Sequence, residues 1–314
     1  MIRRPALATA FVALTLALAA CTSSAGGPSA SPGSSSSTSG TQSGSPRTPL
    51  ASSLQHVVII VDENKTATSI IGNSAAPFLN GLARKYATAY QYSGVTHPSL
   101  PNYLAMTSGT TAGINTDCNP PGGSCLVTGP NIAQALDRSH RTWKMYAESM
   151  PTPCSVRNTK LYAVKHIPFL FFPSVTSDPS YCASHVVRFS QFAADLASTD
   201  SLPNYSFISP NLCNDMHNCS IATGDAWLAA VVPSILRSPA FTQQRSLLVV
   251  TFDEGDSSDN VIACVFAGSA AAPHAKSTAP FNHYSLLRTI EGEWGLPPMT
   301  ANDASALPMT PLLR

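Results

Sequence analysis

A serine in the stretch 96–103 has the surroundings of a reactive hydroxyl. The stretch reads Thr-His-Pro-Ser-Leu-Pro-Asn-Tyr. This pattern predicts a loop that turns into a helix, with Ser99 at the N-cap and Pro101 in the first turn. Because a helix N-terminus attracts anions, a hydroxyl placed there could attack a phosphoryl group. The alternative is that Ser99 only caps the helix, a position that serine often fills.

Polar clusters follow three predicted strands, at the residues where each strand ends. The clusters are Asp62-Glu63-Asn64, then Asn211, Asn214, Asp215 and His217, and finally Asp253-Glu254-Gly255-Asp256. Each could be ordinary turn chemistry. Because the carboxyl ends of parallel strands meet at one edge of a sheet, we expect the three clusters to lie together. Their oxygens and imidazole suit a divalent metal ion such as Mg²⁺, Ca²⁺, Mn²⁺ or Zn²⁺.

The elements that must position these residues alternate between strands and helices. Strands are expected at 56–61, 87–92, 142–147, 205–209, 246–252 and around Cys264, and helices at 76–86, 131–138, 189–197, 226–236 and 283–294. This alternation predicts an α/β fold, a three-layer sandwich with a mostly parallel central sheet. We expect Asp225 to cap the helix at 226–236, and loops at 150–184.

The first fifty residues differ in composition from the rest. Residues 1–20 combine Arg3 and Arg4 with an apolar run, which predicts an export signal. The run ends in Leu-Ala-Ala-Cys, which resembles a lipobox and predicts a lipid on Cys21; the alternative is an ordinary secretory signal. Residues 21–53 are rich in Ser, Gly and Pro, a composition typical of a flexible tether. Residues 54–314 are expected to form one folded domain on the outer face of the membrane.

Charge and cysteine content narrow the class of protein further. The net charge is +1 with 11% charged residues, and without a basic stripe we expect no nucleic-acid partner. The oligomeric state stays open. In an exported chain most cysteines should pair. Proximity suggests the disulfides Cys118–Cys125, Cys154–Cys182 and Cys213–Cys219, with Cys264 as a buried free thiol. No CxxC pair is present, so cysteine-bound zinc is not expected.

Taken together, the motifs resemble one known family. The chain is similar to the phosphoesterase family of bacterial acid phosphatases and phospholipases C, a branch of the alkaline-phosphatase superfamily. The matching stretches are 56–64, 96–105, 214–217, 224–228, 247–254 and 283–297. They span the whole domain in order. The resemblance implies an alkaline-phosphatase-like α/β fold.

The same resemblance implies roles for individual residues. Ser99 matches the nucleophile, and Glu63 and Asn64 match the metal-binding pair after the first strand. Asp253 and Glu254 match an acidic metal-binding pair, although many relatives carry a second aspartate where this chain has glutamate. The remaining implied residues are Asp215 as a further metal ligand, and His217 and His283 as histidines that contact the phosphate or the metal.

The resemblance implies a membrane-tethered acid phosphatase outside the cytoplasm. It would hydrolyse phosphate monoesters, phosphoinositides such as phosphatidylinositol 3-phosphate among them, through a phosphoserine intermediate. Its expected partners are therefore a phosphate monoester or phospholipid substrate and a membrane reached through Cys21. One alternative is a phosphodiesterase of the phospholipase C type, whose relatives carry added C-terminal modules. Another is a lipoprotein that binds phosphorylated ligands without turnover, against which the intact Ser99 argues.

The anchor prediction has a direct test. Replacing Cys21 with Ser should release the protein from membranes into the medium with its activity intact, because the lipid would be lost and the domain left unchanged. Fractionation of cells that express each form would measure this. A Cys21→Ser protein that stays with the membrane fraction would place the anchor elsewhere.

Overall fold

A computed structural model describes residues 53–314 of the chain. The predicted signal at 1–20, the lipid on Cys21 and nearly all of the tether at 21–53 lie outside the described residues. In the part that is described, no helix has both the length and the apolar character needed to cross a membrane.

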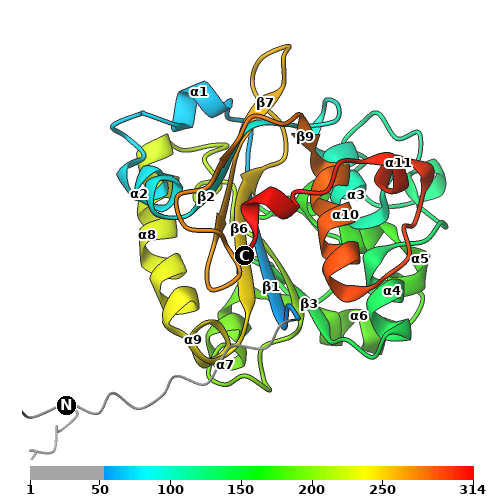
Figure 1. Ribbon diagram of the computed structural model, residues 1–314. Coiled ribbons are helices and arrows are strands. Elements are labelled where there is room, and N and C mark those ends of the chain that lie inside the picture. Colours follow the sequence, from blue (N-terminus) through cyan, green and yellow to red (C-terminus); the bar gives the residue numbers. More distant parts are fainter. Residues whose placement is uncertain (1–52) are drawn as a thin grey trace, which may run out of the picture. The chain divides into compact units, whose positions relative to one another are not determined.

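A nine-stranded sheet lies at the centre of the described chain (Figure 1). Its order is β4-β3-β5-β1-β6-β7-β2-β8, with β9 also paired to β2. The strands are β1 (His56–Asp62), β2 (Ala87–Ser93), β3 (Trp143–Ala147), β4 (Val186–Arg188), β5 (Tyr205–Ser209), β6 (Ser246–Phe252), β7 (Val261–Ala267), β8 (Lys276–Ser277) and β9 (Phe281–Asn282). Strands β4, β3, β5, β1 and β6 pair in parallel, whereas β7 runs antiparallel to both β6 and β2. The α/β class is confirmed, and the sheet is mixed rather than parallel throughout.

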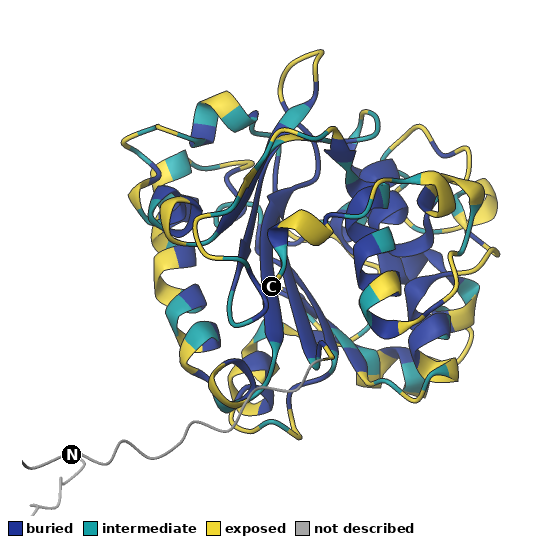
Figure 2. Cartoon of the chain, viewed as in Figure 1, coloured by how far each residue is buried: buried dark blue, intermediate teal, exposed yellow. Residues whose placement is uncertain are grey.

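The sequence explains why β1 and β6 occupy the middle of the sheet. Both are runs of β-branched and other apolar residues, and all seven residues of each strand are buried. A strand that is apolar on both faces must be covered on both faces. Figure 2 shows these strands buried along their length, with the exposed residues on the outer sides of the helices. The parallel register of β1 and β6 makes the two strands end at the same level.

Helices lie to either side of the sheet in Figure 1, with α2 and α8 on one side and α3 and α10 on the other. The longer helices are α2 (Pro77–Lys85), α3 (Ser99–Ser108), α4 (Ile132–Arg138), α6 (Pro179–His185), α8 (Ile221–Arg237) and α10 (His283–Trp294). The shorter ones are α1 (Ala67–Ile70), α5 (Pro173–Thr176), α7 (Phe192–Asp195), α9 (Pro239–Gln243) and α11 (Ala301–Ser305). Short 3-10 helices complete the set: η1 (Gly123–Cys125), η2 (Val164–His166), η3 (Pro168–Phe171), η4 (Phe189–Gln191) and η5 (Thr310–Leu312).

The expected cap of α8 is wrong. The helix begins at Ile221, and the side chain of Ser220 accepts the hydrogen bond from the Thr223 amide. Asp225 lies inside the helix and is buried. Its carboxylate accepts hydrogen bonds from the amides of Phe78 and Leu79, at 2.9 and 2.8 Å, in the first turn of α2. Asp225 therefore caps a helix distant in sequence, which local pattern does not reveal.

The segment expected to be loops at 150–184 holds several short helices instead. Three of them start on a proline, namely Pro168, Pro173 and Pro179. Proline has the backbone angle of a first helical residue and lacks only an amide that needs no partner there. Each helix is too short to show a period. The helix expected at 189–197 is likewise split between η4 and α7.

The disulfide predictions are confirmed. Cys118–Cys125, Cys154–Cys182 and Cys213–Cys219 are bonded, and Cys264 is a buried free thiol in β7. The second disulfide ties the segment before η2 to α6. The third closes a short loop after β5. The cross-links therefore lie in the irregular segments, which have fewer backbone ladders to hold them.

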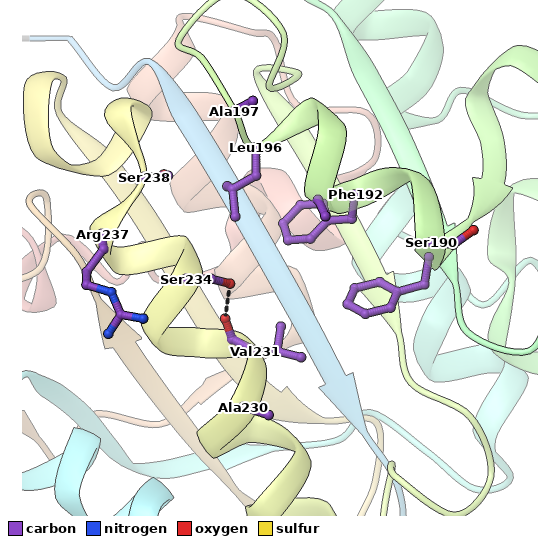
Figure 3. A pocket seen from close by; sticks show the side chains of 11 residues that line it. Ser190, Phe192, Leu196, Ala197, Ala230, Val231, Ser234, Arg237 and Ser238 are labelled. Atoms are coloured by element: carbon purple, nitrogen blue, oxygen red, sulfur yellow. Dashed lines mark hydrogen bonds between the residues drawn. The ribbon is translucent and has the colours of Figure 1, made fainter. Parts of the chain in front are cut away.

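A cavity of about 500 Å³ lies between η4, α7 and α8 (Figure 3). Apolar side chains such as Phe192, Leu196 and Val231 line it, with Arg237 at one end. None of its lining residues is one of the sequence-predicted site residues. The predicted site residues lie elsewhere, at the carboxyl ends of β1 and β6.

The contact between α8 and α2 leads to a stability prediction. Replacing Asp225 with Ala should lower the free energy of unfolding by about 1–2 kcal/mol, because two amides of α2 lose their acceptor. Urea unfolding followed by circular dichroism would measure the loss. Asp259→Ala, which removes a carboxylate from an exposed loop, serves as the control and should change stability by less than about 0.5 kcal/mol. Equal stability of the two variants would contradict the assignment.

Candidate active site

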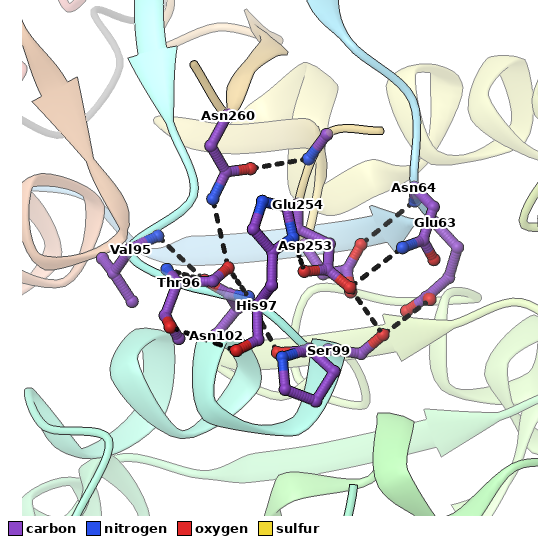
Figure 4. A network of polar contacts seen from close by, with 12 residues as sticks. Glu63, Asn64, Val95, Thr96, His97, Ser99, Asn102, Asp253, Glu254 and Asn260 are labelled. Carbon is purple, nitrogen blue, oxygen red and sulfur yellow. Dashed lines mark hydrogen bonds and ion pairs between the residues drawn. The ribbon is translucent and has the colours of Figure 1, made fainter. Parts of the chain in front are cut away.

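Ser99 is the first residue of α3, and its hydroxyl does not cap the helix. Pro98 stands at the N-cap and no side-chain cap bond is formed, so the predicted N-cap role of Ser99 is wrong. The Ser99 Oγ atom instead lies 3.2 Å from each of three groups: Glu63 Oε2, Glu254 Oε1 and Lys165 Nζ. Figure 4 shows the hydroxyl pointing toward the two carboxylates. A hydroxyl held this way is available for chemistry.

Asn102 holds the loop that leads to Ser99. Its side-chain oxygen accepts hydrogen bonds from the amides of Val95 and Thr96, at 2.8 and 3.2 Å. Its side-chain nitrogen donates to the Thr96 carbonyl at 2.8 Å, and that carbonyl also accepts from Asn260 at 3.1 Å (Figure 4). An asparagine that folds back on the preceding loop in this way fixes the path of the chain that leads to Ser99.

Glu63 follows β1 and is fully buried. Its Oε1 atom accepts a hydrogen bond from the Tyr103 hydroxyl at 2.6 Å and lies 3.0 Å from His166 Nε2. Burial alone would raise the pKa of Glu63, but His166, Lys165 and Tyr103 outweigh it and lower the pKa to about 2. Glu63 is therefore a carboxylate at any pH at which the protein would work.

Asn64 connects the ends of β1 and β6. Its backbone lies in the left-handed region, with φ of 45°, a conformation that asparagine tolerates better than most residues. Its amide donates to Asp253 Oδ1 at 3.2 Å, and its side chain donates to Glu254 Oε1 at 2.9 Å. This turn aims the Asn64 side chain at the same group of carboxylates as Ser99 (Figure 4).

Asp253 and Glu254 follow β6. The Asp253 amide donates to the Asp62 carbonyl at 3.1 Å, which continues the β1–β6 ladder into the site. Burial, together with the charges of Glu63 and Glu254, raises the pKa of Asp253 well above its ordinary value. One Glu254 oxygen contacts His97 Nδ1, and the other accepts from Ser99 and Asn64. The acidic pair predicted from sequence is thus brought together with Ser99.

The cluster after β5 also reaches this edge. Asp215 is buried, and its backbone carbonyl accepts from the Glu63 amide at 2.8 Å. Its Oδ2 atom lies 3.7 Å from His166 Nδ1, and burial and Glu63 raise the pKa of Asp215 to about 9. The side chain of His217 is exposed, and its ring lies 6.3 Å from the His166 ring. The Cys213–Cys219 disulfide brackets both predicted residues.

His283 opens α10 and is completely buried. Its Nδ1 atom lies 2.9 Å from the Tyr92 hydroxyl, and its Nε2 atom lies 2.5 Å from the Asp253 carbonyl oxygen. Burial lowers the pKa of His283 to about 4, so the ring is neutral at neutral pH. Both ring nitrogens are engaged by protein groups, an arrangement that holds Asp253 in place.

Sequence reasoning missed three residues of the site: Lys165, His166 and Tyr103. The first two lie in η2, in the segment expected to be loops, and Tyr103 lies in α3. Burial lowers the pKa of Lys165, but Glu63 and Asp117 outweigh it and hold the pKa above its ordinary value. The available signal was a Lys-His pair directly before the apolar run at 167–172.

The buried oxygens at this edge suit a cation. Side-chain oxygens without a hydrogen-bond partner are both of Asp62 and one each of Asn64, Asp215 and Asp253. Unpaired buried oxygens are costly, and hard oxygen donors are what Mg²⁺ and Ca²⁺ prefer, so the donor set fits a divalent ion. Within residues 53–314, no three His, Cys, Asp or Glu side chains already stand in the spacing of ligands around one ion.

An open cavity of about 440 Å³ lies over the site. Its lining residues are Asn64, His97, Gly255, Asp256, Ser257 and Ser258. His97 contributes a side chain that is 49% exposed. The carboxylates and Ser99 are buried, whereas His97 is reached from solvent, so a substrate would enter past His97.

The fold and the site define a class of protein. A serine, acidic residues and a lysine gather at the carboxyl edge of an α/β sheet, as expected for an enzyme of phosphate-ester chemistry. The sequence model of the Phosphoesterase family matches residues 72–297. The chain therefore belongs to the phosphoesterase family.

Two curated relatives agree with this family. The chain is 40% identical over 274 residues to "Phosphatidylinositol-3-phosphatase" of Mycobacterium tuberculosis, covering 84% of this chain and 86% of the relative. It is 34% identical over 241 residues to "Phosphate-repressible acid phosphatase" of Penicillium chrysogenum. That alignment covers 73% of this chain but 57% of the relative's length.

Solved structures agree with the fold. A protein of the alkaline phosphatase superfamily from Vibrio parahaemolyticus superposes with a TM-score of 0.55 at 13% sequence identity. The match covers 81% of this chain and 69% of that one. At this level of identity the likeness concerns the fold alone.

The Tyr103 contact leads to a testable prediction. Tyr103→Phe should lower kcat/KM for p-nitrophenyl phosphate by roughly ten- to a hundredfold, because a hydrogen bond to the charged Glu63 is worth about 1.5–3 kcal/mol. Tyr162→Phe, which removes a hydroxyl bonded to the Ser155 carbonyl, is the matched control and should stay within twofold. Steady-state kinetics would decide. Equal rates for Tyr103→Phe and wild type would remove Tyr103 from the site.

Proposed function

We propose that this protein is an acid phosphatase that hydrolyses phosphate monoesters through a phosphoserine on Ser99. Membership of the phosphoesterase family and two relatives named as phosphatases support phosphatase activity. The observation that carries the proposal is the Ser99 hydroxyl, which faces Glu63, Glu254 and Lys165 instead of capping its helix. A serine used only for structure would have no need of these partners.

In the first step, Ser99 Oγ attacks the phosphorus of the monoester. The Ser99 proton passes to Glu254, which accepts its hydrogen bond at 3.2 Å and whose pKa is raised by burial. The bond between phosphorus and the ester oxygen breaks, and the alcohol departs. Lys165 donates to Ser99 Oγ and favours the attacking alkoxide.

The departing alkoxide needs a proton. His97 is exposed at the mouth of the site, with Nδ1 held by Glu254 and its other nitrogen left for solvent or substrate. We assign it as the proton donor to the leaving group. In the second step, water gives a proton to His97 while its oxygen bonds to phosphorus. The bond between phosphorus and Ser99 Oγ breaks, phosphate is released, and Ser99 takes its proton back from Glu254. His217, exposed beside His166, is assigned to the rim that contacts the substrate.

A divalent metal ion belongs to this proposal. Glu63, Asn64, Asp253 and Glu254 would hold it, with Asp215 as a further ligand. Asn64, Asp253 and Asp215 each have a buried oxygen without a partner, and the charges of Glu63 and Glu254 crowd Asp253. When bound, such an ion would neutralise the charge that develops on the phosphoryl oxygens. His283 supports this group through the Asp253 carbonyl.

The substrate and the location are also proposed. The relative named phosphatidylinositol-3-phosphatase is 40% identical over most of both chains, which supports a phosphoinositide as one substrate. The signal, Cys21 and tether in the sequence support a domain held at the outer face of the membrane. An open cavity at the site leaves room for a bulky alcohol group.

Replacing Ser99 tests the proposal. Ser99→Ala should lower the rate of p-nitrophenyl phosphate hydrolysis by several orders of magnitude, on the order of the 10⁶ lost when serine-enzyme nucleophiles are removed. The melting temperature should stay near that of wild type, since no cap is lost. Wild type should yield acid-stable phosphoserine after quenching with substrate, and the variant should yield none.

Ser108→Ala is the control for this experiment. Ser108 is buried in the same helix and donates to the Leu104 carbonyl at 2.9 Å. Its loss should leave activity within twofold of wild type. The bis-ester bis(p-nitrophenyl) phosphate should be a poor substrate. An active Ser99→Ala enzyme, or faster hydrolysis of the bis-ester than of the monoester, would overturn the proposal.

A further inference from the structure

Lys165 is the cation that faces Ser99. Its Nζ atom lies 3.2 Å from Ser99 Oγ and 3.1 Å from Asp117 Oδ2. Among the described residues, no other Lys or Arg side chain forms a hydrogen bond to this hydroxyl. The other groups at Ser99 Oγ are the carboxylates of Glu63 and Glu254, so Lys165 brings positive charge into acidic surroundings.

Asp117 holds Lys165 in this position. One Asp117 oxygen accepts from Lys165, and the other accepts from the amide of Leu100 at 3.2 Å, in the first turn of α3. Asp117 therefore ties the lysine and the Ser99 helix to one carboxylate. The Cys118–Cys125 disulfide begins at the next residue and restrains the loop that carries Asp117. The lysine is only 21% exposed, which limits the screening of its charge by solvent.

The position of Lys165 has a consequence for the choice of substrate. Once Ser99 Oγ attacks, the phosphorus is bonded to that atom, and its non-bridging oxygens lie beside the Lys165 ammonium. A phosphate monoester carries up to two negative charges on these oxygens, whereas a diester carries one. A fixed cation at this place attracts the doubly charged group more strongly than the singly charged one.

We propose that Lys165, positioned by Asp117, is a catalytic residue that selects doubly charged phosphoryl groups over phosphate diesters. This inference rests on the proposed function, because it requires Ser99 to be the nucleophile. It assigns to η2 a role in both rate and selectivity. Asp117, which reaches the phosphoryl group only through Lys165, is a positioning residue.

The experiment compares Lys165→Met with Lys160→Met in the full chain. Lys160 is an exposed lysine of the same segment and forms no ion pair in the described part of the protein, so it controls for the loss of one positive charge. Lys165→Met should lower kcat/KM for p-nitrophenyl phosphate by about a hundredfold, the scale seen when one charge-stabilising donor is removed. Lys160→Met should stay within twofold.

Inhibition of the same reaction tests selectivity. At pH 7.5, competitive inhibition by inorganic phosphate should weaken at least tenfold in Lys165→Met, whereas inhibition by diphenyl phosphate should weaken by a clearly smaller factor, because this anion carries one charge. Lys165→Arg should recover most of the phosphate inhibition, because it keeps the charge. Asp117→Asn should weaken phosphate inhibition by a smaller factor, because the lysine stays but loses its anchor.

The outcomes separate this inference from the proposed function. Unchanged phosphate inhibition in Lys165→Met, or an equal loss for phosphate and diphenyl phosphate, would overturn the role of Lys165 while leaving a phosphoserine on Ser99 intact. An active Ser99→Ala would instead overturn the proposed function. Melting temperatures identify a variant that fails to fold.

If Lys165→Met does not fold, Asp117→Asn and Lys165→Arg test the inference in its place. Unchanged phosphate inhibition in Asp117→Asn would then count against the inference.

Discussion

The burial of several carboxylates at one sheet edge is the constraint on which the rest of the site depends. Glu63, Asp215 and Asp253 follow three neighbouring parallel strands and therefore meet where those strands end. Their repulsion, added to desolvation, raises the pKa of Asp253 and Asp215. A fold can keep such a group only if positive charge and hydrogen-bond donors are brought to it. Lys165 and the Tyr103 hydroxyl are such groups.

This requirement explains why the irregular segment at 150–184 packs over the site. The segment is folded through η2, which brings Lys165 to Ser99 and His166 to Glu63. A single disulfide, Cys154–Cys182, joins the start of this segment to α6 near its end. Without regular ladders, such a segment is positioned by side-chain contacts and cross-links. It serves the core as well, because Phe169, Phe171 and Phe172 of the same segment are fully buried.

At the same edge, the groups that would react first are buried and the group that would face the departing alcohol is exposed, which suits the proposed reaction. Ser99 and Glu63 are buried, so their interactions act in a low local dielectric. His97 lies at the surface, where an alcohol would leave. The buried, neutral ring of His283 fixes the Asp253 backbone through its contact with the Asp253 carbonyl oxygen.

The sequence alone determined the strong strands and most of the oxygen donors, because these follow from apolar runs and from residues placed directly after strands. It also suggested the three disulfides, which pair cysteines that are neighbours in the order of the chain. Only the tertiary structure decided that the Ser99 hydroxyl turns to Glu63, Glu254 and Lys165, and that Asp225 caps α2. The tertiary structure also decided that Lys165 lies beside Ser99. Each of these depends on contacts between segments far apart in the chain, and local pattern carries no information about them.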